Sequence, residues 1–438
     1  MQLGVVGTGH VGLVTCVTFA EFGHEVVATD EDQEKLALLE GGEAPFFEPG
    51  LQELLHKHRN GRLTFSHDKR SLTEAEAVFI CVGTPPRATG EANLAAVENS
   101  ARELAEHAQG KTLIVEKSTV PAGTATRLRR VLRHARPDLH DDLDVVSNPE
   151  FLREGAAIED SLNPSRILVG ANSEWARERM RGVYRPLIDK GVEFIETDIA
   201  TAELSKHACN AFLALKISYI NAIARLCERA GADVELVAEV LGSDERIGPH
   251  FLKAGLGFGG SCFPKDLRAF DRLSQELGYD FALLRDIAKV NEEAVDAALA
   301  KISDALWNLE GKRVAMLGLS FKPGTDDVRF SPALELARKL IDRGATVVGY
   351  DPHARVAAKV EVPEIQIAPS VEDAIEGSHC LVLATEWPEF RELDLKRARK
   401  LMADPVIVDA RNFFEGEDAR AAGFTYYPVG RPPLLPNE

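Results

Sequence analysis

One glycine-rich stretch contains the residue best suited to covalent chemistry. Residues 255–266 read GLGFGGSCFPKD, so that Cys262 stands between two glycines and a charged pair. Pro264 suits the first turn of a helix, which places Cys262 at or just before a helix N-terminus and beside Lys265. The helix N-terminus and the Lys265 ammonium group both favour the thiolate form of Cys262. Asp266 would lie on the same helix face as Cys262, one turn later. We interpret Cys262 as a nucleophile rather than as a buried structural thiol, which is the commoner role.

A second candidate site lies at the start of the chain. Gly7, Gly9 and Gly12 form the pattern GxGxxG, which directly follows an apolar strand pattern at residues 2–6 and precedes an apolar helix pattern. A second strand closes on Asp30, about 20 residues further on, and this context is typical of a dinucleotide-binding unit. A carboxylate at this position accepts hydrogen bonds from a ribose 2′-OH and repels a 2′-phosphate. The sequence therefore favours NAD over NADP.

Further polar residues follow the other strands expected in this first sheet. The expected strands at residues 77–82, 112–116 and 143–147 each end in a polar or turn-forming cluster. Ligands of open α/β sheets bind outside these carboxyl ends. Thr84 and Thr119 are thus candidates to contact the nicotinamide end or a catalytic water, and either could equally be a simple turn residue.

Two other charged features of this unit are weaker on their own. Lys35 could reach the ribose or a phosphate, or it could be a solvated helix lysine. Glu150 and Glu154 would share a face on a helical turn, where paired carboxylates can separate into one ionised group and one with a raised pKa. A solvated helix surface would show the same spacing.

The middle of the chain is predicted to be helical. Residues 200–230 lack Pro and Gly, are rich in Ala, Leu and Ile, and end at Gly231, which indicates one long helix. Glu203, Lys206 and Asn210 fall on one stripe of it. If these polar side chains face inward, burying them costs free energy unless they serve a function. If they face outward, they are simply solvated. The periodicity leaves both arrangements open. The length of this helix suits a domain connector and a packing surface for a second subunit.

The last part of the chain repeats the α/β layout without GxGxxG, so we expect no second dinucleotide there. Lys322 and Arg329 follow its first strand, where cations can meet phosphate. The expected fold is therefore α/β, with two Rossmann-like doubly wound domains joined by a central helical domain with one long helix. The expected boundaries are 1–199 for the NAD domain, 200–305 for the helical domain and 306–438 for the substrate domain.

The bulk composition narrows the class of protein. The chain has 438 residues, 45% of them hydrophobic and 27% charged, as in ordinary globular proteins. A net charge of −18 argues against a sequence-independent grip on nucleic acid. No run is long enough to span a membrane, and no signal segment precedes the first strand. The six cysteines show no CxxC pair, so we expect reduced thiols, a cytoplasmic protein and no metal.

Five motifs in order resemble the UDP-glucose/GDP-mannose dehydrogenase family over nearly the whole chain. They are GTGHVG at residue 7, NPEFLREG at residue 148, the helix with Lys206 and Asn210, GFGGSCFPKD at residue 257 and FKPGTDD at residue 321. The resemblance implies a four-electron oxidation of a sugar C6 hydroxyl to a carboxylate with two NAD in sequence. UDP-glucose is the expected substrate, and a homodimer or larger homo-oligomer through the central helix is the expected assembly.

The resemblance also implies roles for individual residues. Cys262 would capture the aldehyde as a thiohemiacetal, which a second oxidation converts to a thioester for hydrolysis. Lys206 and Asn210 would stabilise oxyanion charge. Thr119, Glu150 and Asp266 would order water and manage protons. Leu256 departs from the family, in which many relatives carry proline, and this bears on loop stiffness.

The binding residues implied by the family form two sets. The cofactor set comprises Gly7, Gly9, Val11, Gly12, Asp30, Lys35, Thr84, Thr119, Glu154, Lys265 and Arg329. The substrate set comprises Glu150, Phe151, Leu152, Arg153, Glu154, Lys206, Asn210, Phe251, Leu252, Lys253, Ala254, Gly255, Gly259 and Lys322.

Three alternatives stay open at this point. Dehydrogenases of GDP-mannose or of UDP-N-acetylhexosamines share the cysteine and differ in sugar recognition. A single-step hydroxyacid dehydrogenase pairs a similar first domain with a Lys and Asn four residues apart, but it would leave Cys262 and the last domain without a role. A non-catalytic nucleotide sensor would not need Cys262, Lys206 and Asp266 together.

Overall fold

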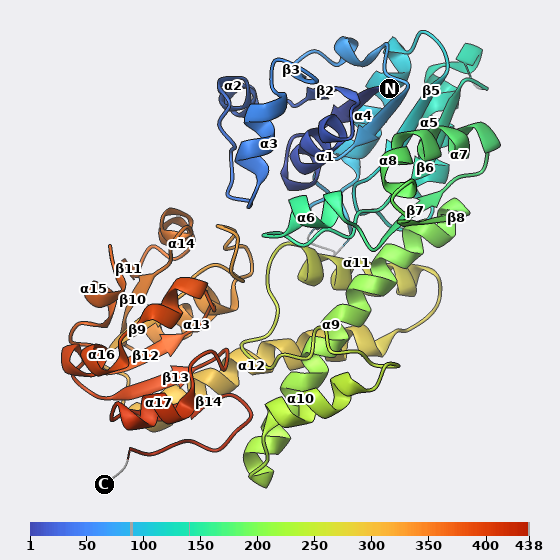
Figure 1. Ribbon diagram of the computed structural model, residues 1–438. Coiled ribbons are helices and arrows are strands. Elements are labelled where there is room, and N and C mark those ends of the chain that lie inside the picture. Colours follow the sequence, from blue (N-terminus) through green and yellow to red (C-terminus); the bar gives the residue numbers. More distant parts are fainter. Residues whose placement is uncertain (88–90, 140, 437–438) are drawn as a thin grey trace. The chain divides into compact units, whose positions relative to one another are not determined.

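The computed structural model describes residues 1–87, 91–139 and 141–436. The chain forms two compact units, one of Met1–Cys209 with Arg268–Tyr279 and one of Asn210–Leu267 with Asp280–Glu438. Each unit contains one mainly parallel sheet (Figure 1), so the predicted pair of Rossmann-like α/β sheets with a central helical region is confirmed.

The sheet of the first unit has the order β3-β2-β1-β4-β5-β6-β7-β8. Neighbouring strands are parallel except β6 and β7, which meet in antiparallel orientation. The strands are β1 (Gln2–Val6), β2 (Glu25–Thr29), β3 (Leu63–Ser66), β4 (Ala77–Ile80), β5 (Thr112–Glu116), β6 (Leu143–Ser147), β7 (Arg166–Gly170) and β8 (Glu193–Thr197).

Alternate residues of these strands enter two separate cores. Leu3 and Val5 of β1 belong to the core under α1, whereas Val6 belongs to the core under α4 and α5. This alternation is the period-two pattern of a sheet covered on both faces. The helices of this unit are α1 (His10–Glu21), α2 (Gln33–Gly41), α3 (Leu51–His58), η1 (Lys69–Leu72), α4 (Ala95–His107), α5 (Thr124–Ala135), η2 (Pro137–Leu139), α6 (Ala157–Leu162), α7 (Glu174–Val183) and α8 (Arg185–Ile188).

The sheet of the second unit is parallel throughout, in the order β11-β10-β9-β12-β13-β14. Its strands are β9 (Arg313–Leu317), β10 (Thr346–Tyr350), β11 (Gln366–Ile367), β12 (Cys380–Leu383), β13 (Val406–Asp409) and β14 (Thr425–Pro428). The helices are α10 (Val234–Ser243), α12 (Ala282–Leu306), α13 (Pro332–Ile341), α14 (Arg355–Glu361), α15 (Val371–Ile375), η3 (Pro388–Glu392), α16 (Leu395–Leu401) and α17 (Gly416–Ala421).

Two helices, α9 (Ile199–Ala230) and α11 (Cys262–Glu276), contribute residues to both units. The predicted long helix at residues 200–230 is confirmed as α9. Gly231, with φ 72°, ends it in the left-handed conformation that glycine adopts at low cost.

The C-terminal tail is held by contacts within the second unit. The residues from Pro428 onward suggest a frayed end, yet Leu434 pairs with Tyr426 beside β14. The amide of Gly430 donates to Glu228, and Arg431 forms an ion pair with Glu235. Partners far away in sequence hold this tail, so its local composition could not reveal them.

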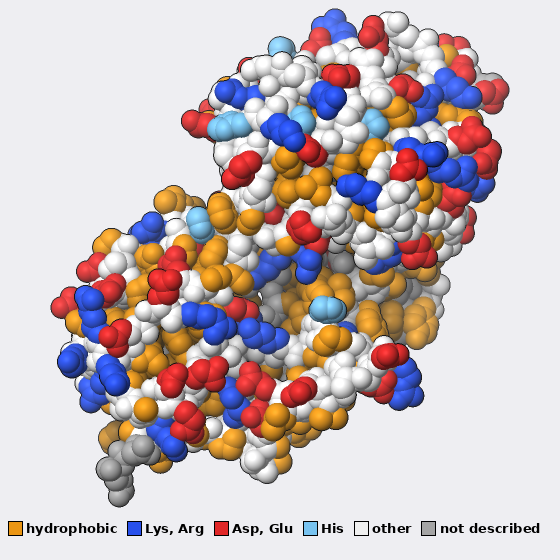
Figure 2. All heavy atoms as spheres, viewed as in Figure 1, with side chains coloured by type: hydrophobic (Ala, Val, Ile, Leu, Met, Phe, Trp, Pro, Cys, Tyr) orange, Lys and Arg blue, Asp and Glu red, His pale blue; other side chains and the backbone are white. Residues whose placement is uncertain are grey.

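The surface agrees with the composition. Acidic and basic side chains are intermixed over the face shown in Figure 2. Within the described ranges, no helix combines the length and the apolar character needed to cross a bilayer.

Candidate active site

The GxGxxG loop joins β1 to α1, and each glycine answers a different constraint. Gly7 has φ 93°, and a Cβ there would meet the Cys81 carbonyl at 2.8 Å. A Cβ on Gly12 would collide with the Gly7 carbonyl oxygen, so this glycine lets helix and strand pack. A Cβ on Gly9 would have no atom within 4 Å, and Gly9 caps α1 without a side-chain hydrogen bond. The loop therefore presents open backbone at a helix N-terminus, which fits a pyrophosphate.

Asp30 follows β2 and is held in a fixed orientation. Its Oδ2 accepts hydrogen bonds from the backbone N–H and the hydroxyl of Thr8, both at 2.7 Å, and from Lys35 Nζ at 3.0 Å. Burial alone would raise the pKa of Asp30, but hydrogen bonds from Asp32 N–H, Thr8 and Lys35 outweigh it and lower the pKa to about 2. The carboxylate is thus ionised at neutral pH and suited to accept from a ribose hydroxyl. Lys35 lies against Asp30, so the structure joins these two predicted residues.

The two predicted threonines lie close together. Thr84 follows β4 and donates from its hydroxyl to the Thr119 carbonyl, which follows β5, at 2.9 Å. Ser118 donates to the Val82 carbonyl at 2.7 Å and thereby joins the same two loops. These contacts bring the carboxyl ends of two neighbouring strands together, as the parallel sheet requires.

Glu150 and Lys206 form a buried ion pair. Lys206 Nζ lies 3.0 Å from Glu150 Oε1, with both side chains less than a tenth exposed. This settles that Lys206 faces inward. The second Glu150 oxygen accepts from the Leu152 N–H at 2.6 Å, and Lys206 Nζ lies 5.3 Å from the Phe151 ring centroid.

Glu150 and Glu154 do not lie on a common helical turn, so the shared face that such a turn would give them does not form. Residues 150–153 have no helical structure, and α6 begins at Ala157. Pro149 precedes this segment, and the Glu150 carboxylate binds backbone two residues ahead, which replaces a helical hydrogen bond. The Arg153 side chain forms an ion pair with Asp160 at 2.6 Å.

Cys262 is the first residue of α11, as the sequence predicts. It is the exposed one of the six cysteines, all of which lie in the described residues, and Ser261 Oγ is 3.9 Å from its sulfur. By contrast, burial raises the pKa of both the Cys81 and the Cys380 thiol to about 12. The geometry thus leaves Cys262 accessible at a helix N-terminus, where a thiolate is favoured.

Asp266 links Asn210 to Lys265. Asn210 Nδ2 donates to Asp266 Oδ2 at 2.6 Å, and Lys265 Nζ lies 3.0 Å from Asp266 Oδ1. Asp266 and Asn210 are almost completely buried, whereas Cys262 is exposed, so cysteine and carboxylate differ in exposure despite their four-residue spacing.

The remaining predicted residues of the second unit include two cations near other side chains and two apolar side chains in a core. Arg329 binds Asp327 with two hydrogen-bonded nitrogens, and Lys322 Nζ lies 5.4 Å from the Phe321 ring centroid. The Leu252 and Ala254 side chains lie in an apolar core, so only their backbone could meet a ligand.

The other predicted substrate residues here, in the 251–255 segment and at Gly259, offer backbone groups and the one cation of Lys253. Phe251 has φ 63°, and Lys253 lies 3.5 Å from Glu386. A Cβ on Gly259 would collide with the Phe330 carbonyl, so this glycine is required for packing.

Two features of the described residues escaped sequence reasoning. Arg411, just after β13, donates to the Ala384 carbonyl at 2.8 Å and lies 3.3 Å from Glu386. Its place after a strand was the available signal. Glu116 and Glu203 are two buried carboxyl groups, and burial followed by the charge of Glu203 raises the pKa of Glu116.

The fold and the glycine loop define an NAD-dependent dehydrogenase. Residues 1–188, 200–293 and 315–416 match, in order, the NAD binding, central and UDP binding domains of the UDP-glucose/GDP-mannose dehydrogenase family. The chain belongs to this family, and the resemblance drawn from its five motifs is confirmed.

Individual relatives cover the chain from end to end. It is 44% identical to a UDP-glucose 6-dehydrogenase of Rhizobium meliloti over 99% of this chain and 100% of the relative. It is 41% identical to one from Bacillus subtilis over 100% and 99%. A solved UDP-glucose dehydrogenase from Pyrobaculum islandicum superimposes with a TM-score of 0.90 at 39% identity over 98% of both chains. A UDP-D-ManNAc dehydrogenase from Pyrococcus horikoshii gives 0.87 at 28% identity, over 98% of this chain and 99% of its own.

Proposed function

We propose that the chain is a UDP-glucose 6-dehydrogenase, which oxidises the C6 hydroxyl of UDP-glucose to the carboxylate of UDP-glucuronate. The observation that carries this proposal is the accessible thiol of Cys262 at the first residue of α11. A thiol lets an enzyme retain the aldehyde and oxidise it again, which a single-step dehydrogenase does not require. The names of the relatives at 41–44% identity support UDP-glucose as the substrate.

The first unit would hold NAD through Gly7, Gly9, Val11 and Gly12 at the pyrophosphate and through Asp30 at the ribose. When bound, NAD accepts a hydride in each of the two oxidations. Thr84, Thr119, Glu154, Lys265 and Arg329 are the other proposed cofactor contacts. Lys35 supports the cofactor indirectly, because its ammonium group helps to keep Asp30 ionised.

The chain's own groups would handle the charge and the covalent step. The alcohol loses a hydride and a proton to give an aldehyde, and the Cys262 thiolate adds to its carbonyl carbon to form a thiohemiacetal. Loss of a second hydride and a proton gives a thioester, and water cleaves it to the carboxylic acid and the thiol. Lys206 and Asn210, one turn apart on α9, are proposed to stabilise the alkoxide and oxyanion.

Protons and water are assigned to three further groups. Glu150 and Asp266 are both buried, and each is ion-paired to a lysine. Together with Thr119 they are proposed to order the hydrolytic water and to exchange protons with the reacting oxygen. The backbone of residues 151–154, the 251–255 segment, Gly259 and Lys322 are proposed to bind the nucleotide sugar.

The decisive experiment is the stoichiometry of the purified protein with NAD and UDP-glucose. We expect two NADH per UDP-glucose consumed. One NADH would indicate a single-step dehydrogenase, and none with any nucleotide sugar would indicate a sensor. GDP-mannose and UDP-N-acetylhexosamines complete the screen, because the ManNAc dehydrogenase has the same fold at 28% identity. If one of these nucleotide sugars is turned over faster than UDP-glucose, it replaces UDP-glucose as the proposed substrate.

We also propose a homodimer through α9 and α10. Phe212, Tyr219 and Leu226 are exposed at seven-residue spacing on α9, and Leu236 and Val240 are exposed on α10. A stripe of this kind on one helix can pair with the same stripe of a second copy. Sedimentation equilibrium is expected to give twice the mass of the chain, and a monomer mass at micromolar concentration would contradict the dimer.

Two further assignments complete the proposal. The three functional domains are placed at 1–199, 200–305 and 306–438, which limited proteolysis would test by cleavage near residues 200 and 306. A cytoplasmic setting is supported by the six cysteines, none of which forms a disulfide. Recovery of the protein from a cell's extracellular fraction would contradict it.

A further inference from the structure

The segment that leads to Cys262 is buried and has an unusual backbone. Residues 255–260 are all buried, and Gly257 and Gly260 have φ of 92° and 76°. Buried backbone groups require hydrogen-bond partners, and this segment lies outside every helix and strand. Its partners therefore come from side chains and loops of the second unit.

Asn291 on α12 supplies two of these hydrogen bonds. Its Oδ1 accepts from the Phe258 N–H at 2.7 Å, and its Nδ2 donates to the Phe258 carbonyl at 3.0 Å. The side-chain amide thus pairs with one residue's backbone as a neighbouring strand would. A Cβ on Gly257 would collide with Asn291 Oδ1, so the glycine provides the room for this approach.

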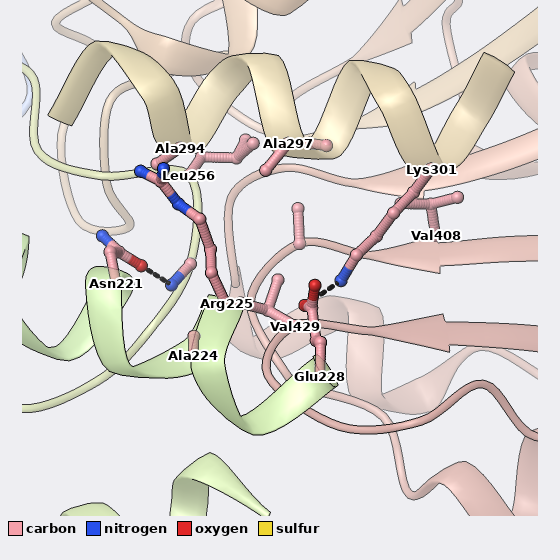
Figure 3. A pocket seen from close by; sticks show the side chains of 13 residues that line it. Asn221, Ala224, Arg225, Glu228, Leu256, Ala294, Ala297, Lys301, Val408 and Val429 are labelled. Atoms are coloured by element: carbon pink, nitrogen blue, oxygen red, sulfur yellow. Dashed lines mark hydrogen bonds and ion pairs between the residues drawn. The ribbon is translucent and has the colours of Figure 1, made fainter. Parts of the chain in front are cut away.

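Asn221 on α9 supplies a further hydrogen bond to the backbone of this segment. Its Oδ1 accepts from the Gly255 N–H at 2.8 Å, and Asn221 is itself buried. Figure 3 shows this bond at the edge of a cavity of about 20 Å³, which Gly255, Leu256 and α12 also line. The volume suits about one water molecule, so this cavity is too small to be a sugar site.

The end of the segment is fixed by a loop. The Gly260 N–H donates to the Arg329 carbonyl at 3.0 Å, two residues before Cys262. The backbone is therefore tied at Gly255, Phe258 and Gly260, with a longer contact of 3.5 Å from Arg411 Nη1 to the Gly257 carbonyl. The ties at Gly255 and Phe258 come from asparagines on different helices.

We propose that Asn221 and Asn291 are positioning residues that set the backbone of the 255–260 segment and thereby the position of the Cys262 sulfur. This inference rests on the proposed role of Cys262 as the nucleophile. An asparagine amide suits the task because it carries one acceptor and one donor group without charge. Both sit on long helices, which hold a supporting side chain more rigidly than a loop does.

The test uses the full chain with Asn291→Ala and Asn221→Ala, and with Asn308→Ala as the matched control. Asn308 is an exposed asparagine just after α12. Because misplacement by about 1 Å can cost about a hundredfold in rate, we expect kcat to fall by about that factor in both variants. The KM for NAD should stay within about threefold of wild type. Asn221→Ala should also raise the KM for UDP-glucose, since Gly255 ends the proposed substrate segment.

A second readout does not depend on turnover. Hydrogen exchange of the amides at Gly255 and Phe258 should accelerate in the corresponding variant and stay unchanged in Asn308→Ala. Asn291→Asp keeps the acceptor for the Phe258 N–H and loses the donor, so it should show an intermediate fall of about tenfold in kcat. It also serves if Asn291→Ala does not fold.

The failure of this inference differs from the failure of the proposed function. Wild-type protein that produces no NADH from any nucleotide sugar would refute the function and leave the exchange test standing. Folded Asn291 and Asn221 variants with wild-type kcat and wild-type amide exchange would overturn the positioning role.

Discussion

Replacing Cys262 with serine is expected to abolish formation of the carboxylate product while leaving NAD and UDP-glucose binding within about twofold of wild type. Serine keeps nearly the same shape, but its hydroxyl is not ionised at neutral pH. The proposed mechanism assigns no general base that would deprotonate this hydroxyl. We expect the rate of UDP-glucuronate formation to fall at least about a thousandfold. The measurement is product formation by chromatography, beside dissociation constants from calorimetry.

Cys209→Ser is the matched control for this variant. Cys209 is partly exposed, and its sulfur lies 3.7 Å from Arg166, so the substitution removes a thiol that is not proposed to react. It should retain turnover within about threefold. Two NADH per UDP-glucose at a near-normal rate in Cys262→Ser would rule out the covalent route.

Local rules explain what the sequence could predict. Gly7 and Gly12 are needed because their neighbours leave no room for a Cβ, and that requirement fixes their spacing. Cys262 falls at the start of α11 because Pro264 can occupy only the first turn of a helix. Periodicity and turn chemistry act within a few residues, so a single sequence is sufficient to read them.

The features that escaped prediction depend on distant partners. Asn291 looks like any polar residue of an amphipathic helix, and only the fold brings it to Phe258. Strands β3, β11 and β14 are hard to recognise in the sequence because each lies at the edge of its sheet, where hydrophobic signals are weak. Glu150 and Glu154 do not share a helical turn, because the Glu150 carboxylate accepts a hydrogen bond from the Leu152 N–H and this contact replaces a helical hydrogen bond.

The buried carboxyl pair gives the other large expected effect. Glu203 on α9 accepts from the Ala125 N–H at 2.8 Å and from the Gly123 N–H at 2.5 Å, so it caps the start of α5. Glu116 is 1% exposed, and the charge that acts on its carboxyl group is that of Glu203. Burial, and then repulsion from Glu203, raises the pKa of Glu116 well above its ordinary 4.5.

The sign of the resulting pH dependence follows from linkage. The unfolded chain releases the Glu116 proton near pH 4.5, whereas the folded chain keeps it until the raised pKa is passed. The stabilisation from Glu116 is therefore complete below pH 4.5. Between pH 4.5 and the raised pKa of the folded chain it is lost by about 1.4 kcal/mol per pH unit.

Glu116→Gln places a neutral amide of nearly the same shape beside Glu203 and cannot ionise, so the variant should lack this pH-dependent loss of stability. As the pH rises from 5 to 7 we expect wild type to lose stability relative to Glu116→Gln, by about 1.4 kcal/mol for each pH unit over which Glu116 stays protonated in the folded chain, so that its Tm falls relative to that of the variant. The measurement is the thermal unfolding midpoint of both proteins across that range. Glu106→Gln, an exposed change on α4, should give a curve parallel to wild type. If the Glu116→Gln curve is also parallel, both carboxyls of the pair are ionised in the folded chain, and the capping of α5 by Glu203 must then tolerate a second negative charge beside it.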